Sequence, residues 1–435
     1  MIPINESVND KRAWVIAVDM GYGHQRTAYP LRKIAFGEKI INANNYKGIT
    51  KKDRGIWELA RNFYESVSDF KKFPLLGDIA FGILEKFQKI LNFYPKRDLS
   101  KPNLSLKVIF AFIKWGWGKD LISKLSKNPL PLISTFFTPV FMAEFFNYPG
   151  DIYCVICDAD IARTWASLIP QKSRIKYFAP NSWVAERLKL YGVRKENVFL
   201  TGYPLPLENI GSEKLEIAKS DLVHRLLNLD PQKAYRRQYQ PLIEKYLGSL
   251  PEKSDHPLTI LFSVGGAGAQ KEMAMRYIKS LAKKIKNQEI KVILTAGVKE
   301  AAREYFLENI KNLGLESNLN KNIEIVFSDN INDYFEEFNK KLRKTDILWT
   351  KPSELSFYAA LGLPILIAPP LGSQEIFNRK WLLEMGSGIE QDNPNCADQW
   401  FFDFLESGRF AEAAMQGFVE AEKLGTFNIK KIISL

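Results

Sequence analysis

Residues 14–28, WVIAVDMGYGHQRTA, decide the fold. The first five are apolar, the loop that follows contains Gly21 and Gly23, and a helical stretch begins near Gln25. A buried strand, a glycine loop and a helix in this order are typical of a unit in which helices cover parallel strands. Glycine lets the backbone come close to a ligand, and the N-terminus of a helix favours an anion. We therefore expect the acceptor side of a reaction, or a phosphate, beside this loop.

The same alternation of strands and helices recurs along the chain in two series. The strands predicted for the first series are residues 14–18, 39–42, 151–157, 175–178 and 197–200. Those predicted for the second are residues 258–264, 290–296, 323–327, 345–350 and 364–368. The clearest predicted helices are residues 161–167, 183–191, 270–287 and 399–423. Such alternation predicts an α/β protein with two Rossmann-like domains and a ligand cleft between them.

The composition along the chain predicts where these domains begin and end. We expect a first domain at 1–205, a linker with a leading helix at 206–257, a second domain at 258–398, and a helical segment at 399–435 that packs back on the first domain. Residues 55–150 are rich in Phe, Trp and Leu with Lys between them, and apolar residues recur at helical spacing in 79–91. This range predicts a helical insertion, serving either as an interfacial segment or as an aromatic-rich core.

The charge balance favours anionic partners. Lys and Arg number 61 against 49 Asp and Glu, a formal net charge of +12 over 435 residues. This excess attracts nucleic acid, an anionic membrane face or phosphorylated substrates, unless the charges only solvate helix surfaces. The sequence contains no nucleic-acid recognition module, so we expect no nucleic-acid partner. The oligomeric state is left open.

The N-terminal residues and the cysteines indicate the compartment. Residues 1–12 are polar, and no apolar stretch reaches the roughly 18–20 residues that span a bilayer. We therefore expect a cytoplasmic protein, either free or, if residues 55–150 are interfacial, peripheral on the inner face of the membrane. Cys154 and Cys157 lie in a predicted strand, where their side chains would point to opposite faces, so we interpret them as buried thiols without a disulfide or metal.

Two side chains of the first domain are candidates for acid–base chemistry. His24, one of only three histidines, follows the first glycine loop and could act as a base on a hydroxyl or donate to a phosphate. Its alternative is a local bond at the start of a helix. Asp158 follows a predicted strand and could be a base or orient an acceptor, its alternative being a helix N-cap.

Two groups of residues in the second domain are candidates for donor binding. Backbone N–H groups at Gly265, Gly266 and Gly268 could hold a diphosphate ahead of a helix, although a plain tight turn would look the same. Polar side chains also recur after two later strands, where carboxylates and amides suit the hydroxyls of ribose or a sugar: these are Ser353, Glu354, Gln374, Glu375 and Asn378.

Taken together, these motifs resemble the GT-B glycosyltransferases, within them the group of MurG and the monogalactosyldiacylglycerol synthases. Residues 21–28, GYGHQRTA, resemble the G-G-G-H-x-x-[SA]-A of that group. Residues 177–188, YFAPNSWVAERL, with TGYP at 201–204, resemble its helix followed by G-I-P. Residues 346–378 resemble its donor region. The similarity covers about 14–40, 150–205 and 258–395.

The resemblance implies an inverting transfer without a bound metal or cofactor, from a nucleotide-sugar, first of all a UDP-sugar, to a hydroxyl. His24 would then be catalytic, the glycines at 265–268 would lie by the diphosphate, and Gln374, Glu375 and Asn378 would face the donor. The chain departs from the group at Tyr22, which replaces a glycine, and at Phe357, where the ribose-binding Glu would fall; Glu354 is its possible substitute.

The acceptor and two other functions stay open at this stage. Lys among Phe and Trp in 55–150 favours an anionic membrane and hence a lipid acceptor. A catalytically inactive GT-B-like nucleotide-binding or scaffold protein would have the same architecture. So would a nucleotide-sugar 2-epimerase, although the paired carboxylates expected for an epimerase are not seen in the sequence.

Overall fold

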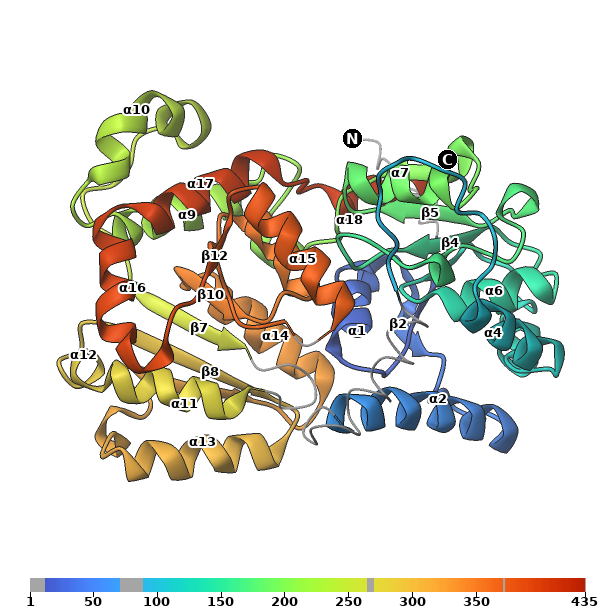
Figure 1. Cartoon of the computed structure of the whole chain (residues 1–435), viewed down its shortest axis with the longest axis horizontal. Coiled ribbons are helices and arrows are strands. Elements are labelled where there is room, and N and C mark those ends of the chain that lie inside the picture. The colour runs from blue at the N-terminus through green and yellow to red at the C-terminus, as the bar shows by residue number, and fades with distance from the viewer. Residues whose placement is uncertain (1–11, 71–88, 264–269, 371, 435) are drawn as a thin grey trace, which may run out of the picture.

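Two parallel sheets flanked by helices form the two domains of the molecule, with the N-terminal domain at the right of Figure 1. The computed structural model describes residues 12–70, 89–263, 270–370 and 372–434, and only the backbone of 63–70. Gly265, Gly266 and Gly268 lie outside the described residues, as does most of the helix predicted at 79–91.

The N-terminal sheet has six parallel strands in the order β2-β1-β3-β4-β5-β6. The strands are β1 (Ala13–Ala17), β2 (Ala35–Asn42), β3 (Leu132–Ser134), β4 (Ile152–Val155), β5 (Lys176–Ala179) and β6 (Val198–Leu200). Every residue of β3 and β4 is buried, as expected for strands covered by helices on both faces. Strand β3 lies between β1 and β4 and was not predicted. It falls inside residues 55–150, the range predicted as a helical insertion. Three residues after a proline are too few to show a period.

The C-terminal sheet also has six parallel strands, in the order β12-β11-β10-β7-β8-β9. They are β7 (Thr259–Ser263), β8 (Lys291–Gly297), β9 (Ile323–Phe327), β10 (Ile347–Thr350), β11 (Ile365–Ile367) and β12 (Gly388–Glu390). Only β12, three residues at the edge, was not predicted. The two sheets confirm the predicted pair of Rossmann-like α/β domains.

The helices cover both sheets and connect the domains. Those up to the linker are α1 (Tyr22–Ala28), α2 (Lys51–Phe70), α4 (Leu104–Lys114), α5 (Lys119–Leu125), α6 (Phe137–Phe145), α7 (Ser182–Leu190), α8 (Leu207–Ile210), α9 (Glu216–Leu229) and α10 (Ala234–Leu247). The later ones are α11 (Lys271–Ser280), α12 (Ala282–Lys286), α13 (Glu300–Asn312), α14 (Ile331–Leu342), α15 (Ser373–Glu384), α16 (Ala397–Glu406), α17 (Arg409–Glu420) and α18 (Gly425–Ile433). The 3₁₀ segments used below are η1 (Tyr29–Ile34), η2 (Arg163–Trp165) and η6 (Glu354–Leu361).

Three predicted helices differ in the structure. The one predicted at 270–287 forms two helices, α11 and α12, which meet at Leu281. Residues 161–167 form only the single turn η2, because the Arg163 side chain donates to the carbonyls of Ala166 and Ser167 and holds this segment in a compact loop. Residues 399–423 form two helices, α16 and α17, which are separated at Gly408. Its φ of 76° favours glycine, and an added Cβ would lie 3.0 Å from the backbone N of Tyr235.

The chain returns to the N-terminal domain at its C-terminal end. Helix α18 buries Ile429 and Ile433 in a cluster that also contains Leu31 and Ile34. Thr426 Oγ1 donates to the carbonyl of Leu205 at 2.6 Å. The last helix therefore ties the C-terminal part of the sequence to the first sheet.

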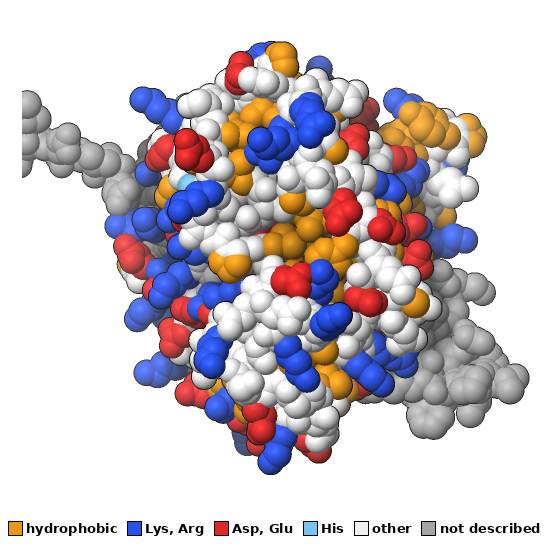
Figure 2. Space-filling model, turned by 90° about the vertical axis from the view of Figure 1, so that its left-hand side faces the viewer, with side chains coloured by type: hydrophobic (Ala, Val, Ile, Leu, Met, Phe, Trp, Pro, Cys, Tyr) orange, Lys and Arg blue, Asp and Glu red, His pale blue; other side chains and the backbone are white. Residues whose placement is uncertain are grey.

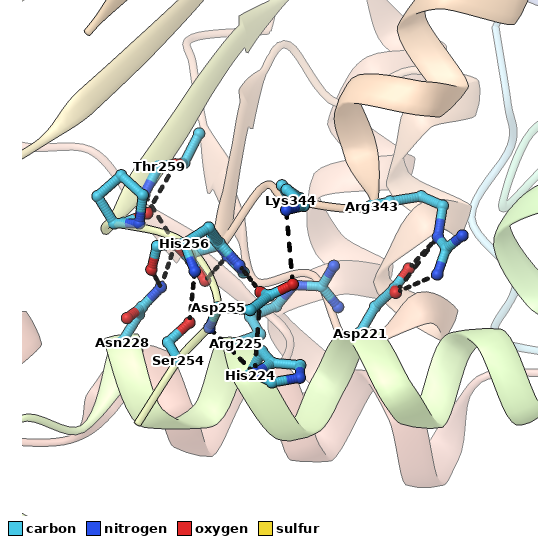
Figure 3. A network of polar contacts seen from close by, with 12 residues as sticks. Asp221, His224, Arg225, Asn228, Ser254, Asp255, His256, Thr259, Arg343 and Lys344 are labelled. Carbon is cyan, nitrogen blue, oxygen red and sulfur yellow. Dashed lines mark hydrogen bonds and ion pairs between the residues drawn. The ribbon is translucent and has the colours of Figure 1, made fainter. Parts of the chain in front are cut away.

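A polar network anchors the segment that leads into β7, as Figure 3 shows. His256 bridges two carboxylates, with Nδ1 2.6 Å from Oδ1 of Asp255 and Nε2 3.1 Å from Oδ1 of the fully buried Asp346. Asp346 also accepts from the backbone N of Thr259 at 2.7 Å. The network lies where β7 and β10 begin, at the edge of the sheet away from the other domain.

Figure 2 shows the face of the C-terminal domain that lies at the left of Figure 1. Lys and Arg side chains are spread over it among Asp and Glu, with a group of apolar side chains near the middle. The net charge of +12 is therefore not gathered into one basic patch on this face. Among the described residues, no helix is both long and apolar enough to cross a bilayer.

Candidate active site between the two domains

His24 lies where three strand ends of the N-terminal sheet meet. It belongs to α1, which follows β1, and its Nδ1 atom is 2.9 Å from the carbonyl oxygen of Thr135, just after β3, and 3.4 Å from Sγ of Cys157, just after β4. Because a carbonyl oxygen can only accept, Nδ1 carries the proton and Nε2 keeps its lone pair. Burial lowers the pKa of His24 to about 4, against the opposing effect of the hydrogen bond to Thr135. The ring is neutral at pH 7, and its bond is a long-range one rather than the local alternative.

Asp158 follows β4 and contacts the C-terminal domain. Asn378 in α15 donates from Nδ2 to Oδ1 of Asp158 at 3.3 Å, and its own Oδ1 accepts from the backbone N of Ala159 at 2.7 Å. Burial raises the pKa of Asp158 to about 7; the Asn378 hydrogen bond lowers it, and the nearby carboxylates of Glu354 and Glu375 raise it. A carboxylate that titrates near neutral pH is suited to general-base catalysis.

The helix-cap alternative for Asp158 is not what the structure contains. The next regular turn is η2, and its N-cap residue is Ala162. The neighbouring Asp160 is used structurally, since both of its oxygens accept from the buried guanidinium of Arg187. Asp158 is therefore the carboxylate of this loop that faces the other domain.

Glu354 belongs to η6 of the C-terminal domain and packs against α1 of the N-terminal domain. Arg26 donates from Nε to Oε1 of Glu354 at 3.1 Å, and both side chains are largely buried. An added Cβ at Gly23 would lie 3.2 Å from Oε2 of Glu354, so glycine at this position allows the carboxylate to approach the helix. Glu354 was predicted to be a donor ligand, and in this structure its carboxylate faces Arg26 and Gly23.

The guanidinium of Arg26 is also enclosed by aromatic rings of α14. Its Cζ lies 4.2 Å from the ring centre of Phe338 and 4.8 Å from that of Phe335. Arg26 is 2% exposed. Arg26 was not predicted as a site residue. Its partners are about three hundred residues away, and no local pattern distinguishes it from its neighbours.

Lys351 and Glu375 supply opposite charges from the C-terminal sheet edge. Lys351 follows β10, Glu375 lies in the first turn of α15, and the Lys351 Nζ donates to Oε1 of Glu375. Both side chains are partly exposed. Gln374 precedes Glu375 in α15, and Ser353 is the N-cap of η6. Lys351 falls inside the donor region predicted at 346–378 but was not predicted as a site residue.

Tyr22, the departure from the glycine of the resembling group, bridges the domains. Its hydroxyl accepts from the backbone N of Val298, which follows β8, at 3.0 Å. Its ring lies 5.4 Å from that of Tyr334. Gly297 makes room for this contact, because an added Cβ would lie 2.2 Å from the Tyr22 hydroxyl. Gly21, with φ 108°, is exposed at the start of α1.

The structure brings five of the predicted site residues to one place. His24, Asp158, Glu354, Glu375 and Asn378 meet where the carboxyl ends of both sheets face each other. Two hollows along the inter-domain boundary lie elsewhere. One of about 360 Å³ is lined by Asn181 and Trp381 among others, and one of about 420 Å³ by Arg32 and Lys340 among others. Their walls include neither His24 nor Lys351, so the candidate site is assigned by its chemistry.

Comparisons with known proteins report similarity at a low level. Residues 251–324 match a family described as a domain of unknown function, DUF6938. A search of curated proteins finds no match. Among solved structures, the chain is similar to UDP-GlcNAc 2-epimerase from Neisseria meningitidis bound to UDP-GlcNAc, with 13% identity and a TM-score of 0.46 over 77% of this chain and 82% of that one.

Two further structures show the range of proteins that it resembles. MurG from Acinetobacter baumannii has 15% identity and a TM-score of 0.43 over 76% of this chain and 77% of that one. UDP-GlcNAc 2-epimerase from Methanocaldococcus jannaschii, in complex with UDP-GlcNAc and UDP, has 12% identity and a TM-score of 0.44 over 97% and 98%. With two parallel six-stranded sheets whose carboxyl ends meet at one interface, the chain has the GT-B architecture that its motifs predicted.

Proposed function

We propose that the chain is an inverting glycosyltransferase that moves a sugar from a nucleoside-diphosphate sugar, first of all a UDP-sugar, to an acceptor hydroxyl. The observation that supports it is the meeting of two proton acceptors, His24 and Asp158, with the cation of Lys351 where the two sheets face each other. The acceptor would bind on the N-terminal side and the donor on the C-terminal side.

The chemistry assigns a different task to each domain. The acceptor oxygen attacks the anomeric carbon from the face opposite the diphosphate, its proton passes to Asp158, and the diphosphate leaves with the bonding electrons. Asp158 suits the role of base because its pKa is about 7. Nε2 of His24 would accept a hydrogen bond from a second hydroxyl of the acceptor and so orient it. On the donor side, Lys351 would meet the charge that develops on the diphosphate.

We propose the donor-binding roles for the residues that the sequence analysis named. Gln374, Glu375 and Asn378 would lie beside the sugar and ribose, with Ser353 near them, and the N–H groups at 265–268 beside the diphosphate. We also propose that transfer needs no bound metal, since Lys351 and backbone N–H groups would carry the charge stabilisation. Transfer rates measured with and without EDTA test this; a rate that EDTA abolishes and Mg²⁺ restores would contradict it.

The central experiment measures sugar transfer and donor hydrolysis with a panel of UDP-sugars. Asp158→Asn is expected to lower kcat/KM by at least about 100-fold, the usual contribution of a positioned base. His24→Ala is expected to lower it by up to about 100-fold, because the acceptor loses the hydrogen bond that orients it. Glu375→Ala is expected to raise KM for the donor. The exposed Asp403→Asn and the remote His224→Ala are matched controls that keep wild-type rates. Wild-type rates in Asp158→Asn and His24→Ala would remove the assignment.

A nucleotide-sugar 2-epimerase is the second candidate, favoured by one specific observation. The sequence did not show paired carboxylates, but the fold brings Glu354 and Glu375 close enough to raise the pKa of Asp158. Grouped carboxylates can remove and return a proton on opposite faces of a sugar. Incubation with UDP-N-acetylglucosamine alone separates the two functions, because an epimerase changes the sugar without an acceptor and a transferase does not.

A GT-B-like scaffold that binds no nucleotide is separated from both by calorimetry, and an inactive nucleotide-binding protein is separated by the absence of turnover in the assays above. Calorimetry against UDP and UDP-sugars is expected to detect heat for an enzyme of either class. A chain that binds no nucleotide would have a scaffold role instead. For a transferase we propose a membrane lipid as the acceptor, which extraction of labelled product into an organic phase would test.

A further inference from the structure

Helix α4 (Leu104–Lys114) presents apolar side chains on two faces. Leu106, Phe110 and Ile113 are buried in the core of the N-terminal domain. On the opposite face Leu104 is 64% exposed and Val108 is 43% exposed. Trp115, directly after the helix, is 74% exposed. The sequence analysis treated this range as one aromatic-rich segment, and only the structure separates its packed side from its exposed side.

The three exposed residues form one stripe, which we call the α4 face and define as Leu104, Val108 and Trp115. They are spaced by four and seven residues, so they lie above one another on a helix. A large exposed apolar side chain beside others of its kind marks an interaction site rather than an ordinary surface.

Positive charge surrounds the α4 face. Lysines occur at 101, 107, 114 and 119, and the sequence contains no Asp or Glu between Asp98 and Asp120. Lys52 of α2 adds a cation from a neighbouring helix: its Nζ lies 5.9 Å from the Trp115 ring centre and donates to the Trp115 carbonyl. An apolar stripe with lysines along one side and beyond both ends complements a surface that is apolar inside and anionic outside.

We propose that the α4 face docks on an anionic lipid bilayer, with α4 lying in the plane of the membrane surface. Tryptophan is the side chain best suited to the boundary between head groups and acyl chains, because its ring is apolar and its N–H can still bond to water or head groups. The lysines would extend toward anionic head groups, each contributing favourable electrostatic attraction at low salt. With 11 residues, α4 is too short to span the bilayer and would lie on it.

The docking face is connected to the candidate active site by packed aromatic rings. Trp117 follows the C-terminal end of α4, and its ring centre lies 4.7 Å from that of Trp57. The ring centre of Trp57 lies 6.5 Å from that of Phe136, and the ring centre of Phe136 lies 4.7 Å from that of His24. Trp57 and Trp117 are each 3% exposed, so these packed rings hold the α4 face in a fixed position relative to His24. If the proposed function holds, docking would therefore set the candidate site at a fixed distance from the membrane. The docking itself does not depend on that function, because it requires no donor and no turnover.

The experiment is co-sedimentation of the full chain with vesicles, one set of phosphatidylcholine alone and one containing phosphatidylglycerol. The wild type is expected to bind the anionic vesicles at low salt, to bind the neutral ones at least about tenfold more weakly, and to be released at high salt. No binding to anionic vesicles at low salt would overturn the proposal.

Two variants and their matched controls localise the contact. Trp115→Ser and the pair Lys107→Glu with Lys114→Glu are each expected to weaken binding at least about tenfold. Leu307→Ser also replaces an exposed apolar side chain by serine, and the pair Lys279→Glu with Lys311→Glu makes the same charge reversal. Both controls lie in the C-terminal domain and should bind like the wild type. Unchanged thermal melting shows that each variant is folded. Equal weakening by variants and controls would overturn the assignment to α4.

Two further readouts separate this proposal from its rivals. Asp158→Asn should bind vesicles like the wild type even if it is inactive, so failure of the proposed chemistry leaves the docking result standing. Light scattering on a sizing column tests whether a second copy covers the face instead. A dimer that Trp115→Ser converts to a monomer, without vesicle binding, would overturn the membrane assignment.

Discussion

His24 and Asp158 show how burial sets proton affinity one residue at a time. Both side chains follow strands of the same sheet, and burial disfavours the charged form of each. For the histidine this lowers the pKa to about 4, and for the carboxyl it raises the pKa to about 7. At neutral pH one group is a neutral hydrogen-bond acceptor and the other is half ionised. The pH range over which the site can accept a proton is therefore determined by Asp158.

The pH dependence of activity follows from that assignment. A base must be ionised to accept a proton, and the raised pKa keeps Asp158 protonated below about pH 7. We therefore expect kcat/KM to rise tenfold per pH unit below about 7 and to level off above it. Initial rates measured from pH 5 to pH 9 check this. A profile with its only inflection near pH 4 would indicate His24 as the base.

At the scale of elements, a buried cation joins α1 to the C-terminal domain in addition to the Tyr22 contacts. Arg26 pairs with Glu354 of η6 and lies over the rings of Phe335 and Phe338 in α14. Two helical elements from one domain therefore enclose one side chain from the other. Because the pair is buried, its contribution to stability is measured by the free energy of unfolding that is lost when one partner is removed.

Replacement of Arg26 should be costly for this reason. Arg26→Ala leaves the Glu354 carboxylate buried without its partner, and we expect the free energy of unfolding to fall by about 3–5 kcal/mol. The double change Arg26→Met with Glu354→Gln removes both charges and should recover most of the loss. Urea unfolding followed by circular dichroism measures both. A double variant no more stable than Arg26→Ala would show that the ion pair is not the source of the effect.

The network around His256 predicts a pH effect on the junction of β7 and β10. Burial alone would lower the pKa of His256, but its bonds to Asp346 and Asp255 outweigh this and raise the pKa above 6.5. The stabilisation is then fully present below pH 6.5 and is lost as the pH rises through the raised value. Lys344 and His224 also face Asp255, at 3.5 Å and 3.8 Å.

The matching experiment compares the wild type with His256→Gln across that range. We expect the wild type to be more stable than the variant by roughly 1 kcal/mol below pH 6.5, and the difference to shrink at alkaline pH. Thermal melts at a series of pH values give the difference directly. A gap that widens with rising pH would contradict the assigned direction of the shift.

At the scale of the whole molecule, the C-terminal helix joins the second domain to the first, and we expect the two domains to unfold together. Ile429 is fully buried against the N-terminal sheet, although it comes after the whole second domain in sequence. Ile429→Ala should lower the free energy of unfolding by about 2–5 kcal/mol, whereas the exposed Lys430→Ala should have little effect. Calorimetry is expected to show one transition for the wild type. Two separate transitions, only one of them shifted by Ile429→Ala, would show independent domains.

The sequence by itself determined the architecture, because strands, glycine loops and helices are encoded by patterns within a few residues. All the predicted strands occur, and the missed ones, β3 and β12, have three residues each, too few to show a pattern. The motifs also named most of the side chains that meet at the interface. The pattern at 161–167 could not show that the Arg163 side chain donates to a nearby carbonyl group and that the segment forms only a single turn.

Only the tertiary structure decided how these side chains are used. Arg26 meets Glu354 across 328 positions of sequence, and Asn378 meets Asp158 across 220, so no local pattern can encode either contact. The pKa values of His24 and Asp158 depend on burial, which exists only after both domains have packed. The exposed face of α4 likewise depends on which of its apolar residues the core covers. Short-range periodicity therefore determined the fold class, and long-range packing determined the chemistry of the site.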